Sequence, residues 1–534
     1  MATLIHDLIF ETAQRAAQAP ALSWQGEEIS YGALAQAVRE VAATLLTLGL
    51  RRGARVAVYL EKRPENVSAM FGAAAAGGVF VPVNPLLKPD QVAYILADCN
   101  VTILVTSRER LAQLGPALAA CPDLQTVLLT GVGATASQLG KVRLLPWRGL
   151  SAAPAPAVPL LWHTVIDTDM AAILYTSGST GRPKGVVLSH RNMLAGALSV
   201  SSYLRNTPQD RILCVLPLSF DYGLSQLTTA FASGACAVLM NYLLLRDIVE
   251  AVEQEAITGL AGVPPLWVQL SQLSWPLSTP LRYITNSGGV MQRSTLDKLR
   301  ESLPRTQVYL MYGLTEAFRS TYLAPEQLER RPDSIGQAIP NAEVLVLRPD
   351  GSVCDADEPG ELVHRGALVA LGYWNDAART AERFKPLPPQ ASGLVLPELA
   401  VWSGDTVRRD ADGYLYFVGR SDDMIKTSGY RVSPAEIEEV AYASGLVGEA
   451  VALGLPHAVL GQAIALPVTP APGVELQRDK VLAACRARLP SYMVPLWVEI
   501  RDGVLPRNPN GKIDRPLLAR ELARAYAVQS GDAA

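Results

Sequence analysis

The chain has 534 residues, of which 49% are hydrophobic and 18% are charged, and its formal net charge at pH 7 is −3. A single hydrophobic core stops growing at about 250–300 residues, so this length predicts at least two domains. The lack of a basic block argues against nucleic-acid binding, and no apolar stretch approaches the roughly 20 residues of a membrane span.

The start of the sequence and its cysteines indicate the compartment. Residues 1–7 lack a cationic segment followed by an apolar core, so no secretory signal is predicted. The six cysteines are scattered without the paired spacing of a metal site. Free, buried thiols in a reducing cytoplasm are therefore the expected state.

The first part of the sequence alternates helical and strand patterns. An amphipathic helix is predicted at 30–46 and a buried strand at 55–60. The apolar segment 70–83 predicts a buried helix that runs into a strand, followed by a helix at 90–97 and a strand at 101–106. Strands that alternate with helices indicate α/β layers.

A proline-rich connector at 151–159 leads to the next part, where a second α/β series runs from about 190 to 340. Strands at 343–347 and 360–365 then predict a β-rich section.

The end of the large body and the start of a smaller unit are also visible in the sequence. Residues 413–420 predict the last strand of the body, and a helix starting at Pro434 opens a compact α+β unit. The boundary is expected at 419–423. It divides the chain into an N-terminal domain, 1–420, and a C-terminal domain, 421–534.

Residues 175–185, Tyr-Thr-Ser-Gly-Ser-Thr-Gly-Arg-Pro-Lys-Gly, form the most informative segment. Glycines let the backbone approach a bulky anion, hydroxyl and N–H groups donate hydrogen bonds, and Lys184 adds a positive charge. The spacing differs from a Walker A loop, because Gly178 and Lys184 are six positions apart and glycine follows the lysine. A polyphosphate is the predicted ligand, and a plain Gly/Ser surface turn is the alternative.

A second segment, Met-Tyr-Gly-Leu-Thr-Glu at 311–316, offers three more groups. Tyr312 provides a flat face for adenine and Thr315 a hydroxyl for phosphate. Glu316 provides a carboxylate for Mg²⁺, which proteins commonly hold through one carboxylate plus phosphate oxygens. Read alone, the same segment is equally typical of a turn.

Three further positions are weaker candidates. Asp405, in a predicted turn at 403–405, can accept hydrogen bonds from ribose hydroxyls or merely cap the turn. Arg420 and Asp422 lie at the expected domain joint. Lys512 stands at the tip of a tight turn near the chain end, where an exposed lysine usually serves only solubility.

Together these segments resemble the adenylate-forming superfamily in identity, order and approximate spacing across almost the whole chain. Acyl-CoA synthetases, firefly luciferase and the adenylation domains of nonribosomal peptide synthesis belong to that superfamily. The resemblance implies a large N-terminal domain, with two α/β layered sheets plus a β-rich subdomain, and a small, mobile α+β lid. It also implies a two-step reaction. A carboxylate attacks the α-phosphate of ATP to give an acyl-adenylate and pyrophosphate, and a thiol then displaces AMP.

The resemblance further implies roles for individual residues. Lys512 bridges the carboxylate and the α-phosphate, and the lid then rotates about the hinge residue Asp422 to bring residues 428–430 to a thiol tunnel. Lys512, Thr315, Glu316 and Lys184 are the implied catalytic residues, with Mg²⁺ on Glu316. The implied nucleotide-binding residues are Thr176, Ser177, Gly178, Ser179, Thr180, Gly181, Lys184, Gly288, Gly289, Met311, Tyr312, Gly313, Leu314, Thr315, Asp405, Arg420 and Lys512.

The acid pocket is expected around residues 216–224. Phe220 and Asp221 are similar to the pair in amino-acid-activating domains, whose aspartate binds the substrate α-ammonium. A buried carboxylate without a cationic partner costs several kcal/mol, so Asp221 needs a cation from the substrate or from Arg319. The implied pocket residues are Asp221, Tyr222, Ser225, Gly262, Thr285, Ser287, Met311, Arg319 and Ser320.

Stand-alone L-prolyl-carrier-protein ligases are the nearest group, and exosortase-associated acyl-CoA ligases share the same segments at 219–224, 285–289 and 312–322. Bulky Tyr222 and Met311 favour a small amino acid, L-proline first. ATP and Mg²⁺ are the implied cofactors. The acceptor thiol is then the phosphopantetheine of a separate carrier protein, or alternatively CoA.

Two readings from other classes stay open. A non-catalytic nucleotide-binding regulator would have little reason to keep Lys512 and Asp405. A luciferase-like oxygenase would need a luciferin pocket that the sequence does not indicate.

Overall fold

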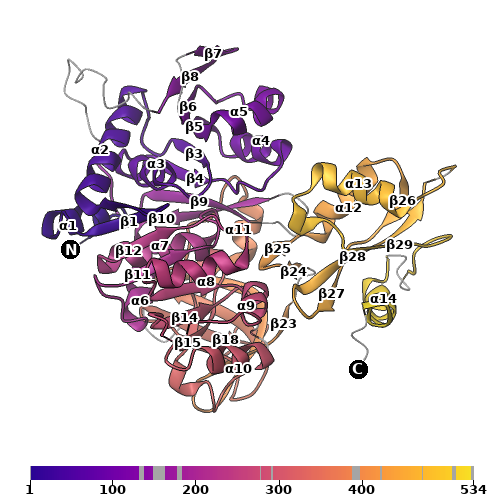
Figure 1. Cartoon of the computed structure of the whole chain (residues 1–534). Coiled ribbons are helices and arrows are strands. Elements are labelled where there is room, and N and C mark those ends of the chain that lie inside the picture. Colours follow the sequence, from indigo (N-terminus) through magenta and orange to yellow (C-terminus); the bar gives the residue numbers. More distant parts are fainter. Residues whose placement is uncertain are drawn as a thin grey trace.

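The computed structural model describes residues 2–131, 137–147, 163–176, 183–276, 278–289, 291, 293–387, 397–420, 424–471, 473–507 and 513–530. Within these residues, a large body holds two extended sheets with helices, and a smaller α+β unit lies at its side (Figure 1). The predicted fold class is confirmed. No helix in this part of the chain is both long and apolar enough to cross a membrane.

One sheet of the body carries the predicted phosphate loop. Its parallel strands are separated by helices, as the alternating pattern predicted, and the antiparallel pair β9–β10 continues it. Its order is β20 (Gly372–Tyr373), β10 (Lys184–Ser189), β9 (Met170–Thr176), β4 (Val79–Pro82), β3 (Arg55–Tyr59), β5 (Val101–Ser107), β6 (Thr126–Thr130), β8 (Val142–Pro146) and β7 (Ser137–Leu139).

Helices α2 and α4 begin within one residue of the predicted starts, whereas α3 begins at Pro64, six residues before the apolar segment 70–83 that predicted it. Ser30 caps α2 through a hydrogen bond that its hydroxyl accepts from the backbone N–H of Ala33, 3.2 Å away. Proline occupies the first turn of α3 and of α4, where its missing N–H is not needed. The helices are α1 (Asp7–Arg15), α2 (Tyr31–Thr47), α3 (Pro64–Ala75), α4 (Pro89–Asp98) and α5 (Arg108–Leu114).

The second sheet changes from parallel to antiparallel along its length. Strands β11 to β15 pair in parallel, and β15 then pairs antiparallel with β16, where the β-rich section begins. Its order is β18 (Ala342–Leu347), β19 (Gly360–Gly366), β22 (Leu399–Arg409), β23 (Leu415–Arg420), β17 (Ser334–Ala338), β16 (Thr321–Leu323), β15 (Gln307–Tyr312), β14 (Tyr283–Asn286), β13 (Gly259–Gly262), β11 (Arg211–Cys214), β12 (Cys236–Leu239), β1 (Pro20–Trp24) and β2 (Glu27–Ser30), with β21 (Phe384–Pro386) beside β22.

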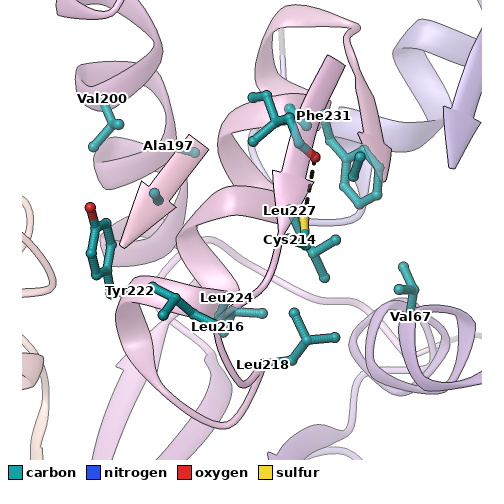
Figure 2. Close-up of a cluster of buried hydrophobic side chains, with 14 of the residues drawn as sticks. Val67, Ala197, Val200, Cys214, Leu216, Leu218, Tyr222, Leu224, Leu227 and Phe231 are labelled. Carbon is teal, nitrogen blue, oxygen red and sulfur yellow. Dashed lines mark hydrogen bonds between the residues drawn. The ribbon is translucent and has the colours of Figure 1, made fainter. Parts of the chain in front are cut away.

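A fully buried helix, α7, lies in the core of the body and begins at the candidate substrate residue. Every residue of α7 from Asp221 to Phe231 is buried. Figure 2 shows Leu224, Leu227 and Phe231 of this helix among apolar side chains of α3, α6 and β11. This packing fixes the helix, so the side chains of its first turn have defined positions. The other helices here are α6 (His190–Tyr203), α7 (Asp221–Ser233), α8 (Leu245–Gln254), α9 (Pro264–Leu270), α10 (Arg293–Ser302) and α11 (Ala377–Arg383).

The prediction of a turn at 403–405 is wrong. These residues lie inside the eleven-residue strand β22, whose register against β19 and β23 shifts at this point. Gly404 has a φ of +70°, a value that glycine adopts readily in an irregular strand. The glycine that indicated a turn therefore marks a β-bulge.

The smaller unit has its own sheet and its own apolar core. The last strand of the body is β23 and the first strand of the smaller unit is β24, while 421–423 lie outside the described residues. The boundary at 419–423 stays a prediction. The elements are β24 (Ile425–Thr427), β25 (Tyr430–Val432), α12 (Pro434–Ala443), β26 (Val447–Ala450), β27 (Leu453–His457), β28 (Gly461–Pro470), α13 (Arg478–Arg488), β29 (Trp497–Ile500) and α14 (Arg515–Ser530).

Three histidines are buried in the body. The rings of His6 and His190 lie edge to face with centroids 5.8 Å apart, and the backbone N–H of Ile5 donates to Nδ1 of His190. His364 contacts the hydroxyl of Ser320 through Nδ1, at 3.0 Å. Burial lowers the pKa of each of the three imidazoles to about 4.

We predict that stability falls as the pH falls from about 6.5 towards 4. The unfolded chain binds these protons near pH 6.5 and the folded chain only near pH 4, so each histidine removes up to about 3 kcal/mol of stability across that interval. Urea unfolding at a series of pH values measures this. His190→Gln should give a shallower pH dependence of the unfolding free energy than the wild type. Equal slopes for wild type and His190→Gln would contradict the prediction.

Candidate active site

The candidate residues gather around a cavity of about 170 Å³ between the body and the smaller unit. The cavity lies near the carboxyl end of β15, where the sheet turns antiparallel, a common place for ligand sites in α/β sheets. The smaller unit supplies its other wall through residues 429–431. The sequence-predicted residues that line it are Thr176, Asp221, Tyr222, Ser287, Gly288, Gly313, Leu314, Thr315, Glu316, Arg319 and Asp405.

The predicted phosphate loop is the connection of the β9–β10 hairpin. Thr176 and Lys184 are directly opposite each other in that pair. The Thr176 hydroxyl is buried and has no hydrogen-bond partner among the described residues. A buried polar group without a partner is costly, so this hydroxyl is a candidate for binding a ligand oxygen. Ser177, Gly178, Ser179, Thr180 and Gly181 lie outside the described residues.

Lys184 and Glu316 form a buried ion pair with a bridging tyrosine. Nζ of Lys184 lies 2.9 Å from Oε1 of Glu316, and the hydroxyl of Tyr373 lies 2.6 Å from each of these two atoms. Burial raises the pKa of the Glu316 carboxyl, but the charges of Lys184 and Arg431 outweigh it and hold the pKa well below its usual range. Burial also lowers the pKa of Lys184, although Glu316 opposes this. Glu316 is therefore ionised.

Tyr373 and Arg431 are site residues that the sequence analysis missed. Tyr373 follows the glycine of β20, in a segment without a recognised motif, and packs beside Phe384. Arg431 belongs to β25 of the smaller unit and lines the cavity. Its position directly after the 428–430 segment was the only signal in the sequence.

The smaller unit also contacts the body through Glu436. Its Oε1 accepts a hydrogen bond from Nε2 of Gln91, at 2.9 Å, and burial raises the pKa of this carboxyl to about 7. Tyr430 lines the cavity and stacks on Tyr492, with ring centroids 3.8 Å apart. In this arrangement the 429–431 segment forms part of the site.

The remaining candidates of the small unit are not described. Asp422 and Lys512 lie outside the described residues, as does the side chain of Arg420. The residues that flank the predicted lysine turn, Arg507 and Ile513, pair with each other across a β-bridge, and Arg507 contacts Glu449 of β26.

A second cavity of about 740 Å³ adjoins the first and shares Gly288 and Gly313 with it. Tyr312, Met311 and Gly289 line it from the body, and elements of the smaller unit close its other side. The Tyr312 hydroxyl donates to Oδ2 of Asp405, at 2.5 Å. The volume is in the range of small-molecule and nucleotide sites.

Asp221 and Arg319 do not form an ion pair. Arg319 is 1% exposed and Asp221 5% exposed, yet among the described residues no cationic nitrogen lies within 4.0 Å of the Asp221 carboxylate. Burial raises the pKa of Asp221, and the more distant charge of Arg319 opposes the rise. The alternative of a resident Asp221–Arg319 ion pair is therefore not formed in this structure.

Arg319 instead lies against Tyr222. Its guanidinium carbon is 4.4 Å from the centroid of that ring, and the Tyr222 hydroxyl is held 2.6 Å from the Thr285 hydroxyl. Nε and Nη2 of Arg319 have no hydrogen-bond partner among the described residues. Arg319 thus supplies a positive charge to the pocket wall while Tyr222 limits its depth.

The other predicted pocket residues lie behind this wall. Ser225, Thr285 and Met311 line a small cavity of about 20 Å³, enough for a single water molecule. Gly262 lies against the Trp267 ring, where a Cβ would approach to 2.7 Å, and Ser320 contacts His364. None of the cavities described above has Gly262 or Ser320 in its lining.

Glu316 fits the predicted magnesium site. Among the described residues, no group of three or more histidine, cysteine, aspartate or glutamate side chains gathers to hold a metal ion. A Mg²⁺ ion that takes most of its ligands from phosphate and water needs only one ionised carboxylate, and the low pKa of Glu316 keeps it ionised.

Comparison with known proteins agrees with this geometry. Residues 9–374 match the AMP-binding enzyme family, and residues 436–512 match the AMP-binding enzyme C-terminal domain. An L-proline–[L-prolyl-carrier protein] ligase of Streptomyces coelicolor is 33% identical over 525 residues, covering 95% of this chain and 94% of the relative. A long-chain-fatty-acid–CoA ligase of Yersinia pestis is 31% identical over 543 residues, covering 96% of this chain and 93% of the relative.

A solved structure shares the fold. The o-succinylbenzoate CoA synthetase of Bacillus subtilis superposes with a TM-score of 0.82 at 25% identity, covering 96% of this chain and 98% of that chain.

We predict strong coupling between Lys184 and Glu316. Lys184→Met alone should lower the free energy of unfolding by about 3–5 kcal/mol, because it leaves a buried charge unpaired. The double variant Lys184→Met/Glu316→Gln should recover most of that loss, since neither charge is then buried. Urea unfolding of wild type, both single variants and the double variant gives the coupling energy.

The exposed pair Arg52–Asp169 serves as the control and should show little coupling. Additive effects of the two buried substitutions would contradict the prediction.

Proposed function

The chain belongs to the AMP-binding enzyme family, and from this premise we propose that it activates a small amino acid, L-proline first, and transfers it to a carrier-protein thiol. As an AMP-forming adenylating ligase, it uses ATP in the first half-reaction. The amino-acid carboxylate attacks the α-phosphate, and pyrophosphate leaves. In the second half-reaction the thiol sulfur forms a bond to the acyl carbon, the bond to AMP breaks, and the thiol releases its proton.

The nucleotide fits between the two cavities. In this proposal the Thr176 hydroxyl and Lys184 bind the phosphates, and Asp405 binds the ribose beside the Tyr312 ring. Glu316 would hold Mg²⁺, which supplies positive charge to the leaving pyrophosphate. Donors and charges that are already oriented stabilise such a transition state without further reorganisation.

The buried carboxylate of Asp221, which has no cationic nitrogen within 4.0 Å among the described residues, is the observation that carries the amino-acid assignment. An unpaired carboxylate in an apolar surrounding is unfavourable, and a substrate α-ammonium removes that cost. Asp221 also lies in the first turn of α7, where the helix dipole favours a negative charge. The Tyr222 ring forms part of the pocket wall and limits the space for the substrate, which favours an amino acid with a small side chain.

The two half-reactions require two positions of the smaller unit. The 429–431 segment lines the site in this structure, which supports a thiol-transfer arrangement. We propose that rotation about Asp422 replaces this segment with Lys512 for the adenylation step. Such domain rotation is an established means of running two steps in one site. The buried, unpaired cysteines are consistent with a reducing compartment such as the cytoplasm.

An acyl-CoA ligase is the second candidate. Arg319 supplies a resident positive charge near Asp221. This charge would partly compensate the Asp221 carboxylate when the substrate has no ammonium group. The 31% identity to the fatty-acid–CoA ligase favours the same reading.

Pyrophosphate exchange with a panel of acids tests the substrate class. We expect exchange with L-proline and other small amino acids, and at least tenfold less with fatty acids or with cyclopentanecarboxylate, in which a methylene group replaces the amine of proline. Asp221→Asn should raise the KM for L-proline at least tenfold because it removes the charge that binds the ammonium. Exchange with fatty acids alone would support the acyl-CoA ligase, and no exchange at all would support a non-catalytic regulator.

The pH dependence of the KM for L-proline provides a second test of the role of Asp221. Its pKa is raised, so the carboxylate takes up a proton as the pH falls, and the KM for L-proline should rise on the acid side. Asp221→Asn should lack this rise.

Lys512→Ala separates the two half-reactions. The variant should lose adenylation by at least a hundredfold, because no other group is proposed to bridge the carboxylate and the α-phosphate. Thioester formation from supplied prolyl-adenylate should stay within about threefold of wild type, since the 429–431 segment serves that step. Equal loss in both assays would refute the division of roles.

A further inference from the structure

Four large exposed apolar side chains lie at or next to one cavity mouth of the body: Leu86 and Tyr242 line the cavity, and Leu243 and Leu244 follow Tyr242 in the chain. Leu243 is 93% exposed, Leu86 and Leu244 are 50% exposed, and Tyr242 is 36% exposed. Residues 242–244 form three consecutive exposed apolar residues just before α8. Such a run on a protein surface indicates an interaction site. We call these four residues the apolar rim.

The rim is held in place by hydrogen bonds. The Asn241 side chain accepts from the backbone N–H of Lys62, at 3.2 Å, and donates to its carbonyl oxygen, at 2.8 Å. Oδ2 of Asp247 accepts from the backbone N–H groups of Leu243 and Leu244, at 3.2 and 2.8 Å. The backbone of the segment is thus fixed, and its leucine side chains face solvent although the chain is ordered.

A cavity of about 300 Å³ leads from the rim to the candidate active site. Leu86 and Tyr242 line its outer part, and Ser428 and the backbone of Gly429 line it from the smaller unit. It shares six residues with the active-site cavity: Pro82, Asn84, Ser219, Phe220, Gly429 and Tyr430. A thiol on a long, thin arm can therefore enter beside the rim and reach the acid pocket.

Three cations near this mouth are already bound to groups of the protein. Lys62 is buried, its Nζ donates to the carbonyl oxygen of Val215 at 2.8 Å, and burial lowers its pKa to about 8. Arg63 is bound to Glu65 through two hydrogen bonds, and Arg110 is paired with Glu61. These cations are already engaged, whereas CoA would bring several phosphates to the mouth.

We propose that the apolar rim is the docking surface for a carrier protein that delivers the acceptor thiol, an inference that rests on the proposed function. The partner presents a complementary apolar face to Leu86, Tyr242, Leu243 and Leu244, and its phosphopantetheine arm enters the cavity. Exposed apolar side chains gain stability by burial against another protein, and a polyanionic nucleotide offers no such burial. This burial favours a protein-bound thiol over CoA as the acceptor.

The test compares three thiols on the full-length enzyme charged with L-prolyl-adenylate. The probes are the phosphopantetheine-loaded L-prolyl-carrier protein of Streptomyces coelicolor, free pantetheine and CoA. Leu243→Glu/Leu244→Glu should lower kcat/KM for the carrier protein at least tenfold and leave transfer to pantetheine within twofold. Leu198→Glu, at a 47% exposed leucine of α6, is the matched control and should change neither.

The possible outcomes separate the hypotheses. Equal losses with carrier protein and pantetheine, or no loss with either, would overturn the docking surface. A wild-type enzyme that prefers CoA to the carrier protein, or transfers to neither, would overturn the assignment of the acceptor. Pyrophosphate exchange with L-proline, measured on the same preparations, reports independently on the proposed amino-acid activation.

Discussion

The buried ion pair of Lys184 and Glu316 joins the two sheets of the body at the site. Lys184 begins β10 of one sheet, and Glu316 follows β15 of the other. Because a buried charge without a partner is strongly unfavourable, the two sheets are held in one relative position wherever both residues remain charged. The bridging hydroxyl of Tyr373 adds a third strand to the same point. The strand ends that flank the predicted phosphate loop, the Glu316 carboxylate and the proposed acid pocket are consequently arranged around one junction.

The same electrostatic rule distinguishes the two acids of the site. Glu316 has cations beside it and is ionised, while Asp221 has none within ion-pair distance and has a raised pKa. The Glu316 carboxylate therefore has its cationic partners within the protein, whereas the Asp221 carboxylate is proposed to receive its partner from the substrate. This contrast is the physical basis for assigning the metal role to Glu316 and substrate selection to Asp221.

The smaller unit adds function through its contacts rather than through its core. Its core is separate from that of the body, yet Arg431, Tyr430 and Glu436 extend into the active-site cavity. Contacts of this kind can be exchanged when the unit rotates, since no shared hydrophobic core has to be broken. The cavity of about 300 Å³ that leads from Leu86 and Tyr242 is also lined by residues 428–430 of the smaller unit, so a rotation of this unit would change the proposed path of the thiol.

The sequence by itself determined the alternation of helices and strands, the segment of the phosphate loop and the family, because periodicity and short motifs are local properties of the chain. It also predicted that Thr176, Asp221, Glu316 and Asp405 belong to one site. Only the tertiary structure revealed the bulge at Gly404, the unpaired state of Asp221 and Arg319, and the roles of Tyr373 and Arg431. Those features depend on packing between segments far apart in the chain, such as the 132 residues between Lys184 and Glu316, and local patterns do not encode such distances.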